Sequence, residues 1–362
     1  MAEIKIEGTV RGTSRLGGII PSFSVQEFLA AGFAYGDLVN IVLGNDGIYT
    51  VPFVTNYTDA GCLGLVLVDY RASGRGLALS ISNETLDNIL SCNPGERFEV
   101  TLRERGGYLD MYRAISTIYT DNPAEYATRE EFANFRPIRT TGVGEGVLYR
   151  SSNPLNGKRN QARRAVADSL CAKAGIRTEL DFGDDPEDVF LAQQEACFGQ
   201  GYCTQLYLKG HTCLGRLKGG VFTGDGPAQV ARALRFMLTH EAPYVVHCDE
   251  GKDRAGLVCM LLEALAGATL EELQTDYMQT FCNFYHLEPG SEKYMAIQDM
   301  TIKRLLYILA HPEKLERVLN LNWTLVKIGD VHPTFAAARY CREQLGFSEA
   351  EVQELRRRLA GA

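Results

Sequence analysis

The sequence has no run of 18 consecutive apolar residues, and this absence excludes a helix that crosses a membrane. It also lacks the basic segment followed by an apolar stretch that marks a signal peptide. Residues 1–10 instead alternate apolar and polar side chains, which predicts a strand. We therefore expect a cytoplasmic protein without integral membrane association, although secretion without a cleavable signal would leave no mark in the sequence.

The sequence has fewer positive than negative charges and no closely paired cysteines. Its 362 residues include 37 Lys and Arg against 45 Asp and Glu, and the net charge of −8 disfavours nucleic acid as a partner. The 10 cysteines are scattered, without the close pairs of a zinc site or the framework of a small disulfide-rich domain. We expect reduced thiols, no metal and no cofactor.

The length and the pattern of the first third predict the domain organisation. A chain of 362 residues exceeds one ordinary core, so two domains are expected. Residues 1–112 contain short apolar or alternating runs, at 38–43, 48–54 and 63–68, that are separated by glycine-rich breaks. Strands at this spacing predict a small β-rich domain, either a barrel or a sandwich.

The pattern changes after this region. Residues 113–330 alternate helical segments with a few strands, which predicts an α/β domain. Residues 331–362 are interpreted as a C-terminal helical extension. Helices are expected at 161–174, 226–240, 255–267, 270–281, 297–309, 333–345 and 348–359.

The segment with the clearest chemistry is HCDEGKDRAG, residues 247–256. Residues 243–247 form an apolar, β-branched run that predicts a buried strand, and apolar side chains recur at helical spacing from Ala255 onward. A tight loop between a strand and a helix N-terminus makes an anion cradle, because backbone N–H groups and the positive helix end face the same point. Gly251 permits the unusual backbone angles of such a loop, and the planar fork of Arg254 grips two phosphate oxygens.

This positive environment predicts a lowered pKa for the Cys248 thiol and a thiolate that attacks phosphorus. The bare Cys-x5-Arg pattern is weak evidence, since it also occurs from Cys171 to Arg177. That copy lies at the end of an amphipathic helical pattern, where Cys171 is interpreted as a small buried residue. The strand, the glycine and the helix around Cys248 favour the copy in residues 248–254.

Residues 247–256 resemble the signature of the atypical bacterial protein tyrosine phosphatases, in which a lysine and an aspartate precede the arginine. Residues 134–136 with 147–152, and residues 175–181, resemble two further segments of that group, so the likeness spans about 112–300. The resemblance implies a protein-tyrosine-phosphatase-like catalytic domain, with a central sheet flanked by helices and the phosphate-binding loop between a strand and a helix. It also implies activity on phosphotyrosine and, in several members, on phosphoserine, phosphothreonine or phosphoinositides.

The chain departs from this family at three places. Asp181 is followed by Phe and Gly where the family has Leu and Arg, so an arginine is missing. Ala255 replaces the commoner threonine or serine, whose hydroxyl normally helps the thiolate to leave. Asp249 and Glu250 are acidic, so they oppose anion binding and raise the pKa of the thiol unless they point to solvent.

The resemblance also implies roles for individual residues. Cys248 attacks phosphorus, and Arg254 holds the phosphate oxygens. Asp253 is the first choice for the general acid and base, with Asp181 as the alternative. Asp181 also matches the pattern of a solvated turn residue in an acidic run. Residues expected to bind the substrate are Asp249, Glu250, Gly251, Lys252, Ala255, Gly256, Arg136 and Arg150.

Several alternatives stay open. Arg136 and Arg150 either contact the substrate or brace the loop through ion pairs. The expected function is hydrolysis of phosphate monoesters of phosphorylated protein through a phosphocysteine intermediate. Phosphoinositides or inositol phosphates are alternative substrates, which Lys252 favours and the two acidic loop residues disfavour. A third interpretation is a non-catalytic phosphate-binding module, and the sequence indicates no oligomeric state.

Overall fold

The structure, a computed structural model, describes residues 3–14, 17–44, 47–61, 63–70, 76–115, 119–156, 160–194, 200–217, 220–315 and 331–362. Its contacts divide the chain into two compact units. The barrel unit comprises Met1–Ser116, Phe222–Gly224 and Met295–Ile328, and the sheet unit comprises Thr117–Val221, Asp225–Tyr294 and Gly329–Ala362. The domain boundaries expected after residues 112 and 330 stay predictions, and the second of them lies outside the described residues.

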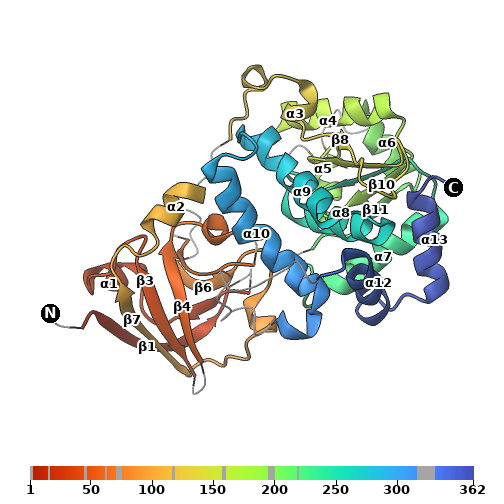
Figure 1. The fold of residues 1–362 in the computed structure, drawn as a ribbon. Coiled ribbons are helices and arrows are strands. Elements are labelled where there is room, and N and C mark those ends of the chain that lie inside the picture. The colour runs from red at the N-terminus through yellow and green to blue at the C-terminus, as the bar shows by residue number, and fades with distance from the viewer. Residues whose placement is uncertain are drawn as a thin grey trace. The chain divides into compact units, whose positions relative to one another are not determined.

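The barrel unit is a closed β-barrel with the strand order β1-β2-β6-β5-β4-β3-β7 (Figure 1). Its strands are β1 (Lys5–Thr13), β2 (Ile19–Pro21), β3 (Leu38–Leu43), β4 (Gly47–Val54), β5 (Leu65–Asp69), β6 (Leu77–Ile81) and β7 (Arg97–Glu104). Neighbouring strands are antiparallel except β4 and β5, which are parallel. The sequence left a barrel and a sandwich open, and the structure has the barrel.

Alternation along the strands explains the barrel core. In β3, Val39, Ile41 and Leu43 are buried while the residues between them are partly exposed, as expected for a strand with one face toward a core. Short helices accompany the strands, namely α1 (Val25–Ala30), α2 (Leu109–Ile115) and the 3-10 turns Tyr57–Ala60 and Leu86–Asn88.

Two later segments of the chain pack on the barrel. The Glu84 carboxylate accepts hydrogen bonds from the Phe222 backbone N–H and the Thr223 hydroxyl, both at 2.6 Å. Arg304, on helix α10 (Glu292–Ala310), donates to the Ala60 carbonyl at 2.6 Å. The barrel unit therefore includes residues that follow its last strand by more than a hundred positions, which strand patterns alone do not predict.

The sheet unit is an α/β structure with the strand order β11-β10-β12-β9-β8. Its strands are β8 (Arg136–Pro137), β9 (Leu148–Ser151), β10 (Thr178–Asp181), β11 (Thr212–Leu214) and β12 (Tyr244–His247). They are parallel except β8, an antiparallel edge strand. Every residue of the central strand β12 is buried, which explains its uninterrupted apolar run.

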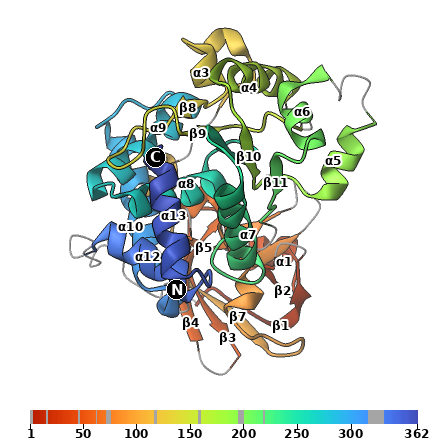
Figure 2. The same cartoon turned by 90° about the vertical axis from the view of Figure 1, so that its right-hand side faces the viewer.

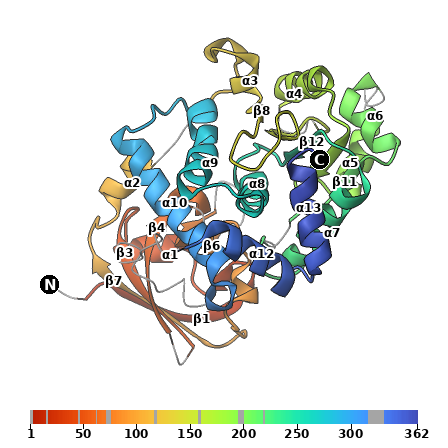
Figure 3. The ribbon, with the colours of Figure 1, turned by 45° about the vertical axis from the view of Figure 1, so that its right-hand side comes forward.

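Helices cover both faces of this sheet. They are α3 (Arg129–Phe132), α4 (Gln161–Ala174), α5 (Pro186–Ala192), α6 (Tyr202–Leu208), α7 (Gly226–Thr239), α8 (Asp253–Ala266), α9 (Leu270–Tyr285), α12 (Pro333–Glu343) and α13 (Glu349–Leu359), with a 3-10 turn at Pro123–Glu125. The 3-10 turn Pro312–Lys314 follows α10 in the barrel unit. Helices α4 and α6 pack together on one face, and α8 packs on β12 and β9 with α12 and α13 on its outer side (Figures 2 and 3). The helices expected from periodicity are therefore present.

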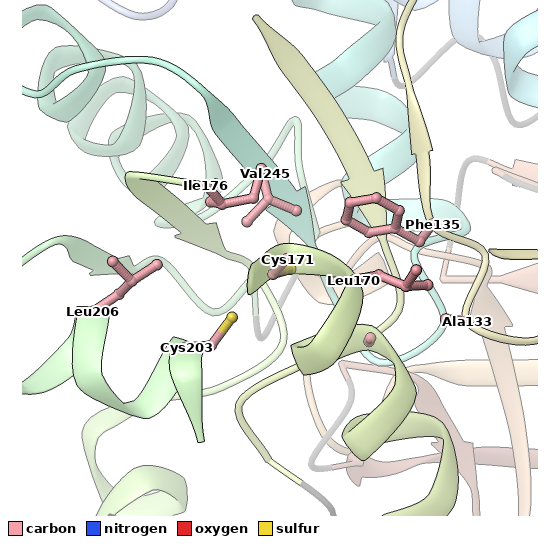
Figure 4. Packing of buried hydrophobic residues seen from close by; sticks show 9 residues of the cluster. Ala133, Phe135, Leu170, Cys171, Ile176, Cys203, Leu206 and Val245 are labelled. Carbon is pink, nitrogen blue, oxygen red and sulfur yellow. The ribbon is translucent and has the colours of Figure 1, made fainter. Parts of the chain in front are cut away.

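The core under α4 is apolar and includes two thiols. Cys171 of α4 and Cys203 of α6 lie in one buried cluster with Leu170, Ile176 and Val245 (Figure 4). Helix α4 ends at Gly175, whose left-handed backbone (φ 66°) favours glycine. The interpretation of Cys171 as a small buried residue is thus confirmed.

Strand register brings three chain segments to one edge of the sheet. His247 pairs with Asp181 of β10 on one side and with Ser151 of β9 on the other. Because these strands are parallel, their carboxyl ends meet where the segment after His247 begins. Among the described residues, no helix is both long and apolar enough to cross a membrane.

Candidate functional site

Residues 248–252 form a tight loop between the end of β12 and the start of α8. Gly251 has a left-handed backbone (φ 69°), and a Cβ there would overlap the Ser151 carbonyl. Both constraints require glycine at this position. The expected strand, loop and helix are therefore present around Cys248.

The Cys248 thiol is buried at the base of this loop, with 3% of the residue exposed. Burial raises its pKa above the usual value, Asp249 and Asp253 raise it further, and Arg254 and a hydrogen bond from the Ala255 backbone N–H lower it. The sequence-based prediction of a lowered pKa is wrong for the free protein. The physical reason is that desolvation of the sulfur outweighs the single guanidinium, which lies among carboxylates.

Arg254 returns to the loop from the first turn of α8. One terminal nitrogen of Arg254 donates to the Phe182 carbonyl at 3.0 Å, and the other contacts the Asp249 carboxylate at 2.8 Å. Phe182 follows β10, so the arginine also links the loop to the neighbouring strand end. Asp249 therefore faces Arg254 inside the loop.

Arg150 braces the loop from beneath. Its guanidinium donates to the carbonyls of Gly251 and Lys252, both at 2.7 Å, and contacts the Asp276 carboxylate at 3.0 Å. The side chain is fully buried among these partners, which matches the role of a brace, and a contact of Arg150 with the substrate stays a prediction. Gly256, also expected at the substrate, leaves room for the Arg150 guanidinium, which a Cβ would overlap.

Arg136 belongs to the same brace. It contacts the Asp276 carboxylate at 2.9 Å and donates to the Asn134 side-chain oxygen at 2.8 Å. The Asn134 amide donates to the Glu250 carbonyl at 3.0 Å. Of the two roles left open for Arg136, these contacts match that of a brace. Sequence reasoning missed Asp276, because nothing local in α9 shows that its carboxylate faces two arginines from β8 and β9.

Lys252 is engaged by its neighbours. Its ammonium donates to the Tyr285 hydroxyl at 2.9 Å and lies 3.3 Å from Glu250 and 3.6 Å from Asp253. Burial raises the pKa of Tyr285 to about 12, so the hydroxyl keeps its proton. Lys252 was the residue that favoured a substrate with a second phosphate, but two carboxylates already offset its charge.

The two candidate acids occupy different places. Asp181 is fully buried, and its carboxylate accepts from the backbone N–H groups of Gly183 at 2.7 Å and Asp184 at 3.0 Å. The Asp253 side chain is 23% exposed in the first turn of α8. Asp181 is therefore not the solvated turn residue that its acidic run suggested. Its burial favours Asp253 as the proton donor, and that assignment stays a prediction.

Buried ionisable groups surround the strand ends beneath the loop. His247 contacts Glu179 at 3.0 Å, and its pKa is raised to about 9 because the charges of Asp181 and Glu179 outweigh burial. Burial, with Asp181 nearby, raises the pKa of Asp184 to about 8, against hydrogen bonds such as that from Asn153. Asp184 belongs to the acidic run that follows Asp181, and it is only 4% exposed.

A cavity of about 190 Å³ opens beside the loop. Asp249 and Glu250 line it on the loop side, Asp184 lines it from the segment after β10, and Tyr119 adds an exposed aromatic ring, whereas Phe284 lies almost fully buried under the Arg163 guanidinium. The other lining residues are Asp121, Asn153, Asn156, Asn160, Arg163, Arg164, Gly183, Asp188 and Arg216. Within the described ranges, no group of three His, Cys, Asp or Glu side chains is arranged to hold a metal ion.

Comparison with known proteins gives one extensive match. A family model described as "Tyrosine phosphatase family" matches residues 130–361. A search of curated proteins found no match. One similar solved structure is an uncharacterized conserved protein from Thermotoga maritima, with 17% sequence identity, 28% of this chain and 37% of that chain covered, and a TM-score of 0.25. That last likeness is too weak to carry an argument.

Proposed function

The chain belongs to the tyrosine phosphatase family, and from this premise we propose that it is a cysteine-dependent phosphatase of protein phosphotyrosine. The observation that carries the proposal is the placement of the Cys248 sulfur at the base of a loop closed by Arg254. The backbone N–H of Ala255 already donates to this sulfur. An anion held by the loop amides therefore brings phosphorus to the nucleophile.

The proposed reaction has two displacements. Cys248 first loses its proton to solvent, because only the thiolate is nucleophilic. The sulfur then forms a bond to phosphorus while the bond from phosphorus to the leaving oxygen breaks, and Asp253 gives that oxygen a proton. Water next attacks the phosphocysteine, Asp253 takes a proton from the water, and the sulfur–phosphorus bond breaks to release inorganic phosphate.

The brace beneath the loop supports this mechanism. The Gly251 and Lys252 carbonyls are held by Arg150 on the far side of the loop. With these carbonyls held by Arg150, the loop keeps its shape, so its N–H groups can bind an anion with little reorganisation during the reaction. Arg254 adds the charged, planar contact that phosphate oxygens require.

The surroundings of the loop favour phosphotyrosine over phosphoinositides. A substrate with several phosphates needs several available cations, but Lys252 is already paired with Glu250 and Asp253. The cavity beside the loop is also lined by arginines, of which Arg163 and Arg216 already contact Asp121 and Asp188, and by the exposed ring of Tyr119. An aromatic leaving group stacks well against such a ring.

A substrate panel tests the proposal. Wild type and Cys248→Ser would be assayed on a phosphotyrosine peptide, a phosphoserine peptide, inositol phosphates and phosphoinositide vesicles, with and without EDTA. We expect chelator-resistant turnover, fastest on the phosphotyrosine peptide, that Cys248→Ser abolishes. Turnover lost with the chelator and restored by zinc or magnesium would overturn the thiolate mechanism, while phosphate binding without turnover would support a non-catalytic binding module.

A further inference from the structure

The three carboxylates of the loop have unequal partners. Glu250 and Asp253 both lie beside the Lys252 ammonium, at 3.3 and 3.6 Å. Asp249 instead lies 2.8 Å from a terminal nitrogen of Arg254. This last pairing occupies the guanidinium that the proposed function assigns to the phosphate.

Several observations place the Asp249 carboxylate close to the reacting atoms. Its residue follows Cys248 directly, and its charge raises the pKa of that thiol. Its side chain and that of Arg254 are 20% and 22% exposed, so solvent only partly screens their attraction. An acidic side chain in this position meets an incoming phosphate dianion with like charge.

We propose that Asp249 is an internal counter-ion of Arg254, which a phosphate dianion must displace, so that this carboxylate sets how weakly the loop holds oxyanions. The inference rests on the proposed function, because it assigns Arg254 to the phosphate. The inference makes Asp249 a specificity-determining residue, because it lowers the affinity of the loop for oxyanions. The consequence is weak retention of the inorganic phosphate that hydrolysis leaves in the loop.

The opposite role for Asp249 makes a distinct prediction. A carboxylate that only orients Arg254 would help the arginine to bind phosphate, and its removal would weaken binding. An internal counter-ion competes with phosphate, and its removal strengthens binding. The sign of the affinity change therefore separates the two roles.

The experiment measures binding of inorganic phosphate and of tungstate by calorimetry in a Cys248→Ser background, where no thiol is present to ionise at this position. Asp249→Asn removes the proposed counter-ion, and Asp249→Ser repeats the test with a smaller side chain. Glu250→Gln is the matched control, because it removes the same charge one residue later, beside Lys252. Thermal unfolding checks that each variant is folded.

We expect Asp249→Asn and Asp249→Ser to bind both oxyanions roughly tenfold more tightly, and Glu250→Gln to change affinity much less. With Cys248 present, Asp249→Asn should lower the KM for an aryl phosphate and strengthen inhibition by phosphate. Unchanged or weaker oxyanion binding in both Asp249 variants would overturn the inference while leaving wild-type turnover, and so the proposed function, intact. Absence of oxyanion binding in every folded variant would overturn the inference and also the assigned role of Arg254.

Discussion

The chain contains the pattern Cys-x5-Arg twice, and the two copies fold differently. Cys171 lies in helix α4 within an apolar cluster, and Arg177 lies after the helix and pairs with Glu241 on the surface, at 2.5 Å. Cys248 lies in a loop, and Arg254 turns back to contact that loop. Burial raises the pKa of both thiols. The pKa of the cysteine therefore does not show which copy is the phosphate-binding loop, whereas the strand–loop–helix geometry does.

The largest expected difference is between substitutions of Cys248 and of Cys171 in their effect on kcat. Cys248→Ser should lower kcat by at least about 10⁴-fold, because the proposed covalent step is lost. Cys171→Ala, which suits an apolar core, should keep near-normal kcat. Steady-state assays on a phosphotyrosine peptide measure both. An inactive but folded Cys171→Ala together with an active Cys248→Ser would reverse the assignment.

The acid assignment compares two carboxylates near the loop. Asp253→Asn should lower kcat by roughly 10²–10⁴-fold on a phosphotyrosine peptide, the usual range for loss of acid–base catalysis. The loss should be much smaller on a nitrophenyl phosphate, whose leaving oxygen needs no proton. Asp181→Asn is the comparison, since its carboxylate is fully buried. Leaving-group dependence in the Asp181 variant alone would make Asp181 the acid.

Substitution of Arg150 and of Arg177 should affect the stability of the protein to different extents. Arg150→Met removes three contacts of a fully buried guanidinium, so we expect a loss of about 3–5 kcal/mol in the free energy of unfolding. Arg177→Met breaks an exposed ion pair and should change stability little. Urea unfolding measures both variants. Equal stability of the two would show that the brace beneath the loop contributes nothing.

Alkylation sharpens the comparison of the two thiols. Because the pKa of Cys248 is raised, its thiolate is scarce at neutral pH in the free protein. Reaction with iodoacetamide should be slow at pH 7 and rise roughly tenfold per pH unit toward alkaline pH. Cys171, in its apolar cluster, should stay unmodified while the protein is folded. Peptide mapping by mass spectrometry follows each site, and rapid alkylation of Cys248 at pH 6 would restore the lowered pKa that the sequence predicts.

The smallest expected effect is on stability as a function of pH. His247, with a pKa near 9, contributes stability that is complete below about 6.5 and is lost as the pH rises through 9. Asp184 keeps its proton to about pH 8 when folded but releases it near 3.9 when unfolded, so its contribution also falls with rising pH. Asp184→Asn should reduce this fall by on the order of 1 kcal/mol per pH unit between pH 5 and 8. Urea unfolding at several pH values would contradict this if wild-type stability were flat or rose.

The sequence predicted the features that depend on neighbouring residues. Helix α4 with its Gly175 cap, the buried strand β12 and the glycine of the loop all follow from local patterns. The brace was harder to predict, because Asp276 meets Arg150 only after helix α9 has packed on α8, which itself packs on β9. Such contacts depend on tertiary packing, so the spacing of residues along the sequence does not reveal them.

Burial explains the two misjudged electrostatic features. An acidic run normally indicates solvent, yet Asp181 is fully buried, and the backbone N–H groups of Gly183 and Asp184 bind its carboxylate. The loop suggested a lowered thiol pKa, but the depth of the Cys248 sulfur was invisible in the sequence. Desolvation is set by the whole fold, so charge patterns alone gave the wrong direction.

The central claim is that phosphate passes through the Cys248 sulfur and not through any other thiol. Wild type would be mixed with a nitrophenyl phosphate, quenched rapidly in acid and digested, and the phosphorylated peptide would be located by mass spectrometry. The account predicts a phosphorylated cysteine in the peptide that contains Cys248, with Cys171 unmodified. A phosphoryl group on Cys171, or rapid turnover with no phosphocysteine trapped at any time, would contradict it.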